Sequence, residues 1–175
     1  MDEKLLKLTL VGNNDCGITQ IIRRYVQGTF SARYSSSDGI DFDSKVLPFS
    51  ERITARLQLW GIGGDCDTFR YHGAHLRGTD GIFVVFDCQR PDSFDDARRY
   101  IHLLSLHLPP SVPVILLMTK CDLPKDSTVP TGQDIVYCCS ALGVAAFFET
   151  SARNADHQVN QPQRSLIYTE SSLFF

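Results

Sequence analysis

The stretch that decides the fold reads Gly12-Asn13-Asn14-Asp15-Cys16-Gly17-Ile18-Thr19. It directly follows an apolar run over residues 5–11, which predicts a strand, and it opens a segment over residues 18–27 with the apolar spacing of a helix. Gly28 is placed to end that helix, because glycine is common just after the last helical residue. A strand that passes into a helix through so short a connection is a basic unit of α/β folds.

Strand-like and helix-like segments continue to alternate along the chain. The further segments expected to form strands are residues 41–47, 54–60, 82–86, 112–118 and 145–148. Two of them, residues 82–86 and 112–118, are apolar on both faces, which is typical of central parallel strands covered by helices on each side. Helices are expected through residues 94–104 and near residues 131–142. The pattern predicts a mainly parallel sheet between two layers of helices.

The composition fits one ordinary globular domain, and we expect a cytoplasmic protein. The chain has 175 residues, of which 43% are hydrophobic, and its net charge of −3 gives no electrostatic reason to bind nucleic acid. Its six cysteines are irregularly spaced and form no C-x-x-C pair, so we expect reduced thiols. Residues 171–175, at its end, include no cysteine, so we expect no prenyl anchor in this chain.

The opening stretch has the spacing G-x-x-x-x-G-x-T, a frame typical of phosphate-binding P-loops. Ile18 stands where that motif has lysine. Taken alone, the frame is as consistent with a plain strand-to-helix turn as with a nucleotide site. The choice between the two depends on the motifs that the rest of the chain carries.

Four later segments carry such motifs: residues 30–42, Leu57–Gly64, Thr119–Asp122 and Glu149–Arg153. In this order they resemble the first switch, the stretch ending in W-D-x-A-G, the N-K-x-D motif and the E-T-S-A-K motif of Rab proteins, a branch of the Ras superfamily of small GTPases. They occur in the family's order and at its spacing. The resemblance covers about residues 4–156.

This resemblance implies the Ras-like P-loop NTPase fold. That fold is a three-layer α/β domain with helices on both faces of a six-stranded, mainly parallel sheet that has one antiparallel edge strand. We expect this G domain to span residues 1–156. Residues 157–175 are expected to form a divergent tail with a short or displaced last helix, because Pro162 would break any helix begun at Ala155.

The resemblance also implies a binding site for GTP or GDP with Mg²⁺. The positions that match the family's cofactor-binding residues are Gly12, Asn14, Gly17, Ile18, Thr19, Thr119, Lys120, Asp122, Ser151 and Ala152. Ile18 cannot supply the charge-assisted phosphate contact of the missing lysine, which is worth about 1.5–3 kcal/mol. Asp15 brings a carboxylate into a loop that should hold anions, and like charges repel. We therefore expect nucleotide binding to be weak or absent.

The magnesium and catalytic positions depart from the family as well. Thr19 keeps the P-loop hydroxyl and Ser37 stands where the first-switch threonine would lie, so these two are the candidate metal ligands. Gly61 replaces the aspartate that anchors the hydrated magnesium, and Asp65 stands at the position of the water-orienting glutamine. Asp65 is shorter and anionic beside a developing negative charge. We therefore assign no catalytic residue and expect negligible GTP hydrolysis.

The base end matches the family better. The resemblance implies that Asp122 accepts hydrogen bonds from the guanine N1–H and amino group, that the stem of Lys120 lies along the base, and that the backbone around Ser151 and Ala152 faces the guanine oxygen. Thr119 replaces the family's asparagine and is expected to lose one contact that tethers the P-loop. These residues could equally be inherited loop scaffolding, because a base bound without its phosphates gains little affinity.

A partner surface is expected beside the two switches. Phe42 and Trp60 match two of the three apolar positions through which Rab proteins contact effectors, and His75 stands at the third. Such an aromatic cluster would suit docking to effector or scaffold proteins, with the chain a monomer or part of a heteromer. Simple core packing is the alternative for Trp60.

Three hypotheses follow from these observations. The first is a pseudo-GTPase that serves as a protein-interaction module in membrane trafficking or signalling and is recruited to membranes or complexes by its partners. The second is a guanine-nucleotide-binding GTPase with very slow hydrolysis that still cycles by exchange. The third is a variant or truncated product whose divergent tail lowers its stability. The lost phosphate and metal positions favour the first.

Overall fold

The computed structural model describes residues 2–32, 39–48, 53–65, 69 and 73–154. Its strands are β1 (Asp2–Gly12), β2 (Ile40–Pro48), β3 (Ile53–Gly63), β4 (Gly81–Asp87), β5 (Val114–Thr119) and β6 (Ala146–Glu149). Its helices are α1 (Ile18–Gln27), α3 (Gly73–Leu76), α4 (Pro91–His107) and α5 (Gly132–Leu142). Two subjects of the predictions above, Ser37 and the tail over residues 157–175, lie outside the described residues.

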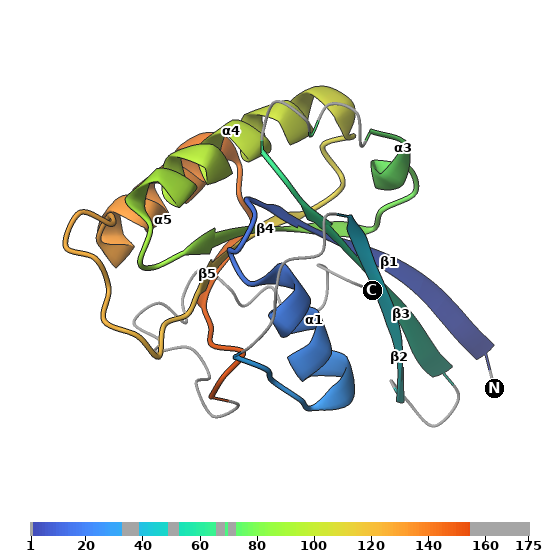
Figure 1. Cartoon of the computed structure of the whole chain (residues 1–175). Helices are drawn as coiled ribbons and strands as arrows, with labels where there is room; N and C mark the ends of the chain where they lie inside the picture. The colour runs from blue at the N-terminus through green and yellow to red at the C-terminus, as the bar shows by residue number, and fades with distance from the viewer. Residues whose placement is uncertain (1, 33–38, 49–52, 66–68, 70–72, 155–175) are drawn as a thin grey trace.

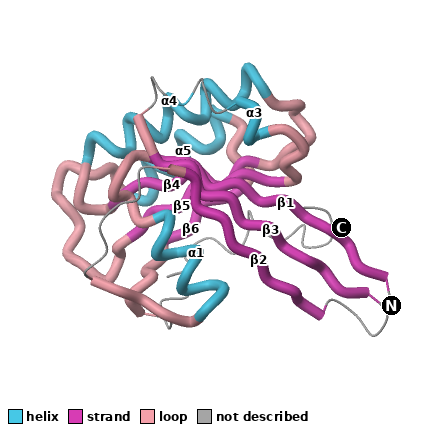
Figure 2. The backbone as a smooth tube through the Cα atoms, turned by 45° about the vertical axis from the view of Figure 1, so that its right-hand side comes forward, coloured by secondary structure: helices cyan, strands magenta, loops and turns pink. Residues whose placement is uncertain are grey.

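The six strands form one sheet in the order β2-β3-β1-β4-β5-β6. All neighbouring strands run parallel except β2, which pairs antiparallel with β3 at one edge. This confirms the predicted six-stranded, mainly parallel sheet with one antiparallel edge strand. Because the carboxyl ends of parallel strands lie at one edge of the sheet, the loops after β1, β3, β4, β5 and β6 gather there (Figure 2).

Helices cover both faces of this sheet, with α1 on one face and α3, α4 and α5 on the other (Figure 1). The buried apolar residues accordingly form two clusters. One joins Ile18 and Ile22 of α1 to the leucines of β1 and β3. The other joins Phe94, Tyr100 and Leu104 of α4 to the central strands. The three-layer arrangement expected from the sequence is therefore present.

The first helix ends where the local sequence predicts, whereas pairing between strands sets the length of β1 and β3. Helix α1 has the predicted bounds, and Gly28 ends it in the left-handed region at φ 70°, where its N–H donates to the carbonyl of Arg24. Strands β1 and β3 exceed their apolar runs because the backbone ladder continues from the Asp2–Ile53 pair to the Gly12–Gly63 pair. Among the described helices, none is long and apolar enough to cross a membrane.

The described cysteines are free thiols. Burial raises the pKa of Cys16 and of Cys121 to about 12, so both thiols stay protonated at neutral pH. Protonated, buried thiols are poor nucleophiles and poor metal ligands. The free thiols agree with the reduced cysteines expected from the sequence.

Candidate functional site

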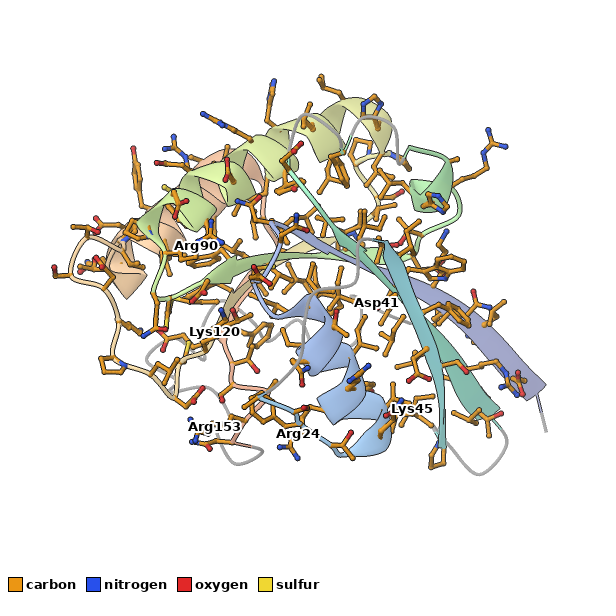
Figure 3. The ribbon with its side chains drawn as sticks, viewed as in Figure 1. Arg24, Asp41, Lys45, Arg90, Lys120 and Arg153 are labelled. Atoms are coloured by element: carbon orange, nitrogen blue, oxygen red, sulfur yellow. The ribbon has the colours of Figure 1, made fainter. Side chains whose placement is uncertain are left out.

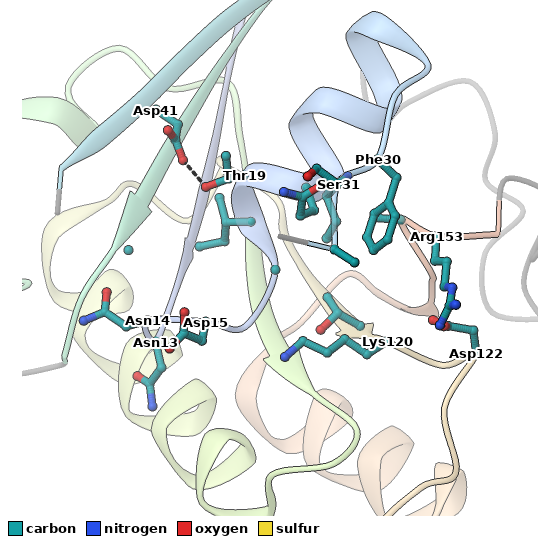
Figure 4. A pocket seen from close by; sticks show the side chains of 18 of the residues that line it. Asn13, Asn14, Asp15, Thr19, Phe30, Ser31, Asp41, Lys120, Asp122 and Arg153 are labelled. Carbon is teal, nitrogen blue, oxygen red and sulfur yellow. Dashed lines mark hydrogen bonds and ion pairs between the residues drawn. The ribbon is translucent and has the colours of Figure 1, made fainter. Parts of the chain in front are cut away.

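A pocket of about 290 Å³ lies at the carboxyl edge of the sheet, where the predicted motifs meet. Of the ten predicted cofactor-binding residues, those that line it are Asn14, Gly17, Ile18, Thr19, Thr119, Lys120, Asp122 and Ala152. Asn14, Asp15 and Asp41 lie at one end of the pocket and Phe30 and Asp122 at the other (Figure 4). We call these the phosphate end and the base end, after the roles that the sequence motifs imply.

The backbone of the P-loop depends on two special positions and on a close approach of two strands. Asp15 and Gly17 both lie in the left-handed region, at φ 64° and 97°, and aspartate is one of the few side chains that tolerate it. At Gly12, a Cβ would lie 2.4 Å from the carbonyl oxygen of Val85, so this position requires glycine. The loop therefore turns tightly around the pocket even with Asn14 and Asp15 in it.

Thr119 connects this loop to the base end. Its Oγ1 lies 2.6 Å from the carbonyl oxygen of Cys16 and 3.0 Å from that of Phe86. A hydroxyl has one proton, so Thr119 donates to one carbonyl at a time, whereas an asparagine amide could donate twice. The shortened side chain thus retains one tether to the P-loop.

The isoleucine at the lysine position turns into the core. Ile18 is buried, at 5% exposure, in the cluster with Ile22, Leu10 and Leu57. A Cβ added to Gly61 would lie 2.7 Å from Cγ2 of Ile18 and 3.0 Å from Cδ1 of Ile22. Ile18 therefore fills the space that a side chain at position 61 would need. Positions 18 and 61, where this chain differs from the family's motifs, are therefore in contact, and this contact could not be predicted from the sequence.

The predicted metal ligand Thr19 has another partner. Its hydroxyl donates a hydrogen bond to the carboxylate of Asp41 on β2, and Asp41 pairs with Gly61 across the β2–β3 ladder. No motif predicts Asp41 at this site, because only the strand register brings it beside Thr19.

These residues are a poor fit for the family's hydrated magnesium. Gly61 offers no carboxylate, and Ile18 occupies the space into which one would project. The part of the chain that the structure describes holds no group of three or more His, Cys, Asp or Glu side chains that could bind a metal ion. Mg²⁺ prefers carboxylates together with phosphates and waters, and Thr19 and Asp41 are the oxygen ligands within reach.

The base end is held firmly by hydrogen bonds. Asp122 is largely buried, its Oδ1 accepts a hydrogen bond of 2.6 Å from Ser151 Oγ, and its Oδ2 lies 4.0 Å from the guanidinium of Arg153. Arg24 of α1 donates from Nε to the carbonyl of Ala152 at 2.6 Å and from Nη2 to that of Arg153 at 3.0 Å. The loop after β6 is therefore fixed to α1.

Charge is distributed unequally between the two ends. Among the described residues that line the pocket, Lys120 and Arg153 are the cations, whereas the phosphate end has Asp15 and Asp41. The ammonium of Lys120 is already paired with the buried carboxylate of Asp87 at 2.6 Å. Figure 3 shows Lys120 and Arg153 on one side of α1 and Asp41, on β2, on the other.

Arg90 lies next to the P-loop but is engaged there. Its Nη1 donates to the carbonyl of Asn14 at 3.2 Å, and its Nη2 lies 3.1 Å from a carboxylate oxygen of Asp92. The hydrogen bond to Asp92 raises the pKa of Arg90, with smaller contributions from nearby carboxylates that include Asp15. Arg90 thus supports the loop backbone and does not replace the missing P-loop lysine.

The segment after β3 is held to the P-loop and to α4. The N–H of Gly64 donates to the carbonyl of Gly12 at 3.2 Å, and the hydroxyl of buried Tyr100 donates to the carbonyl of Gly64 at 2.8 Å. Asp65, at the position of the catalytic glutamine, follows directly; its side chain is exposed and is not part of the described pocket lining.

The predicted partner residues lie together, Phe42 and Trp60 on the sheet and His75 on the neighbouring helix α3. The rings of Phe42 and Trp60 are 4.8 Å apart, those of Trp60 and His75 are 6.3 Å apart, and the ammonium of Lys7 lies 5.0 Å from the Trp60 ring. Phe42 is 54% exposed and Trp60 is half-buried, so Trp60 belongs partly to the core and partly to the surface. We call Phe42, Trp60 and His75 the aromatic patch.

Comparison with known proteins agrees with this geometry. A model of the Ras family matches residues 7–169. The human Ras-related protein Rab-32 is 37% identical over 156 residues, which cover 87% of this chain and 69% of that protein. Ras-related protein Rab-32A of Dictyostelium discoideum is 32% identical over 87% of this chain and 72% of its own length, and human Ras-related protein Rab-7L1 is 31% identical over 94% and 82%.

Proposed function

This chain belongs to the Ras family of small GTPases and is Rab-like, and from that premise we propose that it is a pseudo-GTPase that acts as a protein-interaction module. It holds one conformation and has no cycle driven by GTP hydrolysis. Its role lies in membrane trafficking or signalling in the cytoplasm, where partners recruit it to membranes or complexes.

The observation that carries this proposal is the packing of Ile18 against Gly61. The lysine that would contact the phosphates and the aspartate that would anchor magnesium are both absent, and hydrocarbon fills the space between their positions. Ile18 and its neighbours are core residues that cannot turn toward a ligand without opening a cavity. At the phosphate end, Ile18 therefore contributes to the hydrophobic core and not to ligand binding.

The residue that would position water for hydrolysis is also absent. Asp65 cannot orient water as a neutral glutamine does, and it lies outside the described pocket lining. Two lost transition-state contacts of about 3 kcal/mol each would slow the reaction by roughly four orders of magnitude. The hydrogen bonds of Gly64 to Gly12 and Tyr100 also tie down the segment that would have to respond to a nucleotide.

Proteins of the Rab family act by binding effector proteins, and the aromatic patch is the surface that we assign to this role. Phe42 presents an exposed ring beside Trp60, and aromatic side chains are enriched among the residues that dominate binding energies. The patch lies on β2, β3 and α3.

A second candidate function is a guanine-nucleotide-binding protein with very slow hydrolysis that cycles by exchange. The hydrogen bonds of the base end support it, because Ser151 orients Asp122 and Arg24 holds the loop after β6. The two candidates differ in whether GTP changes the protein.

Hydrogen exchange of β2, β3 and the following segment, measured with and without GTP and Mg²⁺, tests the choice. We expect equal protection in both conditions, because the residues described at the phosphate end offer a triphosphate no lysine and no magnesium-anchoring carboxylate at position 61, and so give it little binding energy. Slower exchange that depends on GTP would support the exchange-cycling GTPase. As a second readout, capture of partners by the immobilised chain should be insensitive to nucleotide and reduced by Phe42→Ala.

A further inference from the structure

We propose that the pocket binds an uncharged guanine nucleoside, such as guanosine, more tightly than it binds GDP or GTP. The inference rests on the pseudo-GTPase proposal and deepens it, because it names the ligand class that the altered pocket takes. The two ends of the pocket and a side chain between them carry it.

The base end retains what recognition of guanine requires. The side chain of Asp122 is 8% exposed. Ser151 donates a hydrogen bond to its Oδ1 and fixes its orientation, and both carboxylate oxygens can still accept further hydrogen bonds. A guanine edge offers two adjacent donors to such a carboxylate, whereas adenine does not. Phe30 and the stem of Lys120 line the space beside Asp122.

The phosphate end disfavours added charge. Asp15 and Asp41 line it, and the nearby cation of Arg90 is already bonded to Asp92 and to the Asn14 carbonyl. The Thr19 hydroxyl is satisfied by Asp41 without any ligand. A phosphate would have to break these contacts and approach two carboxylates, so each added phosphate should weaken binding.

A neutral donor lies between the two ends. Gln20, on the turn of α1 after Thr19, is buried at 9% exposure and lines the pocket. Its Oε1 accepts a hydrogen bond of 3.1 Å from the N–H of Ser31, which fixes the orientation of the amide. Its Nε2 then remains a buried donor without a partner in the structure. Such a group is expected to be satisfied by something that enters the pocket.

Asn13 does not contribute to this match. It lies beside Asn14 at the phosphate end, and its side chain points away from the pocket toward α4, where its Nδ2 donates to Asp96 (Figure 4). The unpaired amide of Gln20 is therefore the group that suits a sugar hydroxyl, which can accept its hydrogen bond without bringing a charge into the pocket. Together with the two carboxylates of the phosphate end, this donor favours a nucleoside over a nucleotide.

Isothermal titration of the full chain with guanosine, GMP, GDP and GTP, each with and without Mg²⁺, tests the proposal. We expect guanosine to bind, adenosine not to bind, and affinity to fall with each added phosphate. Affinity that rises with phosphate number, above all when Mg²⁺ is present, would overturn both this inference and the pseudo-GTPase proposal. The ion would then be held by Thr19 and Asp41. No binding of guanosine at millimolar concentration would overturn this inference alone and leave the proposed function standing.

Two variants make the assignment specific. Gln20→Leu should weaken guanosine binding by roughly 3- to 10-fold, as one lost hydrogen bond would, and should leave the binding of the sugar-free 9-methylguanine unchanged. Asp122→Asn should abolish the binding of both ligands. Equal effects of Gln20→Leu on the two ligands would show that Gln20 acts only through folding and would overturn its role at the sugar.

Discussion

The base end and the phosphate end of the pocket share one scaffold but have kept different properties. At the base end, Ser151 orients Asp122 and Arg24 holds the loop that follows β6. The phosphate end turns through left-handed residues at Asp15 and Gly17, has Ile18 at the position of the motif's lysine, and is lined by the carboxylates of Asp15 and Asp41. The backbone turn of the P-loop and the charge of the side chains that line it are therefore separable features of the chain.

Substitutions that restore the family's residues at the phosphate end should have the largest effect on stability. Gly61→Asp alone should lower the free energy of unfolding by about 1–3 kcal/mol, because its Cβ would overlap Ile18. Ile18→Lys alone should lower it by about 2–4 kcal/mol through lost core packing. The double variant should lose about 0.5–3 kcal/mol less than the sum, because the lysine vacates the space. Urea unfolding of the four proteins measures this; strict additivity would show that the two positions are not coupled.

Removal of the tether between the two ends should have the next largest effect. Thr119→Val keeps the shape of the side chain and removes the hydroxyl that bonds the Cys16 carbonyl. We expect a loss of about 1–3 kcal/mol in the free energy of unfolding, because a buried carbonyl is left unpaired. Thr128→Val, at an exposed turn, is the matched control and should change stability little. Equal effects of the two variants would argue against the tether.

The anchor of the base end is a smaller contribution. Arg24→Gln removes the donors to the carbonyls of Ala152 and Arg153, and should lower stability by about 1 kcal/mol. The distinctive readout is amide exchange, which should become faster over residues 151–154 while α4 is unaffected. Arg77→Gln, at the far side of the sheet, serves as the control. Unchanged exchange over residues 151–154 would mean that the base end is rigid for another reason.

Asp15→Gly should give the smallest change in stability and the sharpest contrast between the two ends. Glycine adopts φ 64° without strain, so the free energy of unfolding should rise by about 0.5 kcal/mol. The lost carboxylate should also favour GDP by roughly fivefold and leave guanosine unaffected. Asn14→Gly, whose backbone is not left-handed, should destabilise slightly instead. An equal gain for GDP and guanosine would contradict the electrostatic account of the phosphate end.

The sequence predicted the elements whose signals are local. Helix α1 has the bounds that its apolar spacing and Gly28 indicate, and the central strands follow their doubly apolar runs. The motifs also predicted that Asp122 and Thr19 face one site, and both residues line the pocket. It was not predictable where contacts depend on register or packing: Asp41 reaches Thr19 only through the β2–β3 ladder, and Ile18 meets Gly61 only across the core. Gln20 lacked a motif altogether, and only its unpaired amide reveals it.

The most direct test of the central claim is the nucleotide content of the protein itself. The chain would be purified in buffer with Mg²⁺ and without added nucleotide. Heat denaturation would then release any bound guanine nucleotide, and ion-pair chromatography would measure its amount. Because the phosphate end offers neither a lysine nor a magnesium-anchoring aspartate, we predict an amount of GDP and GTP far below one per chain. One equivalent of GDP or GTP per chain would contradict the account.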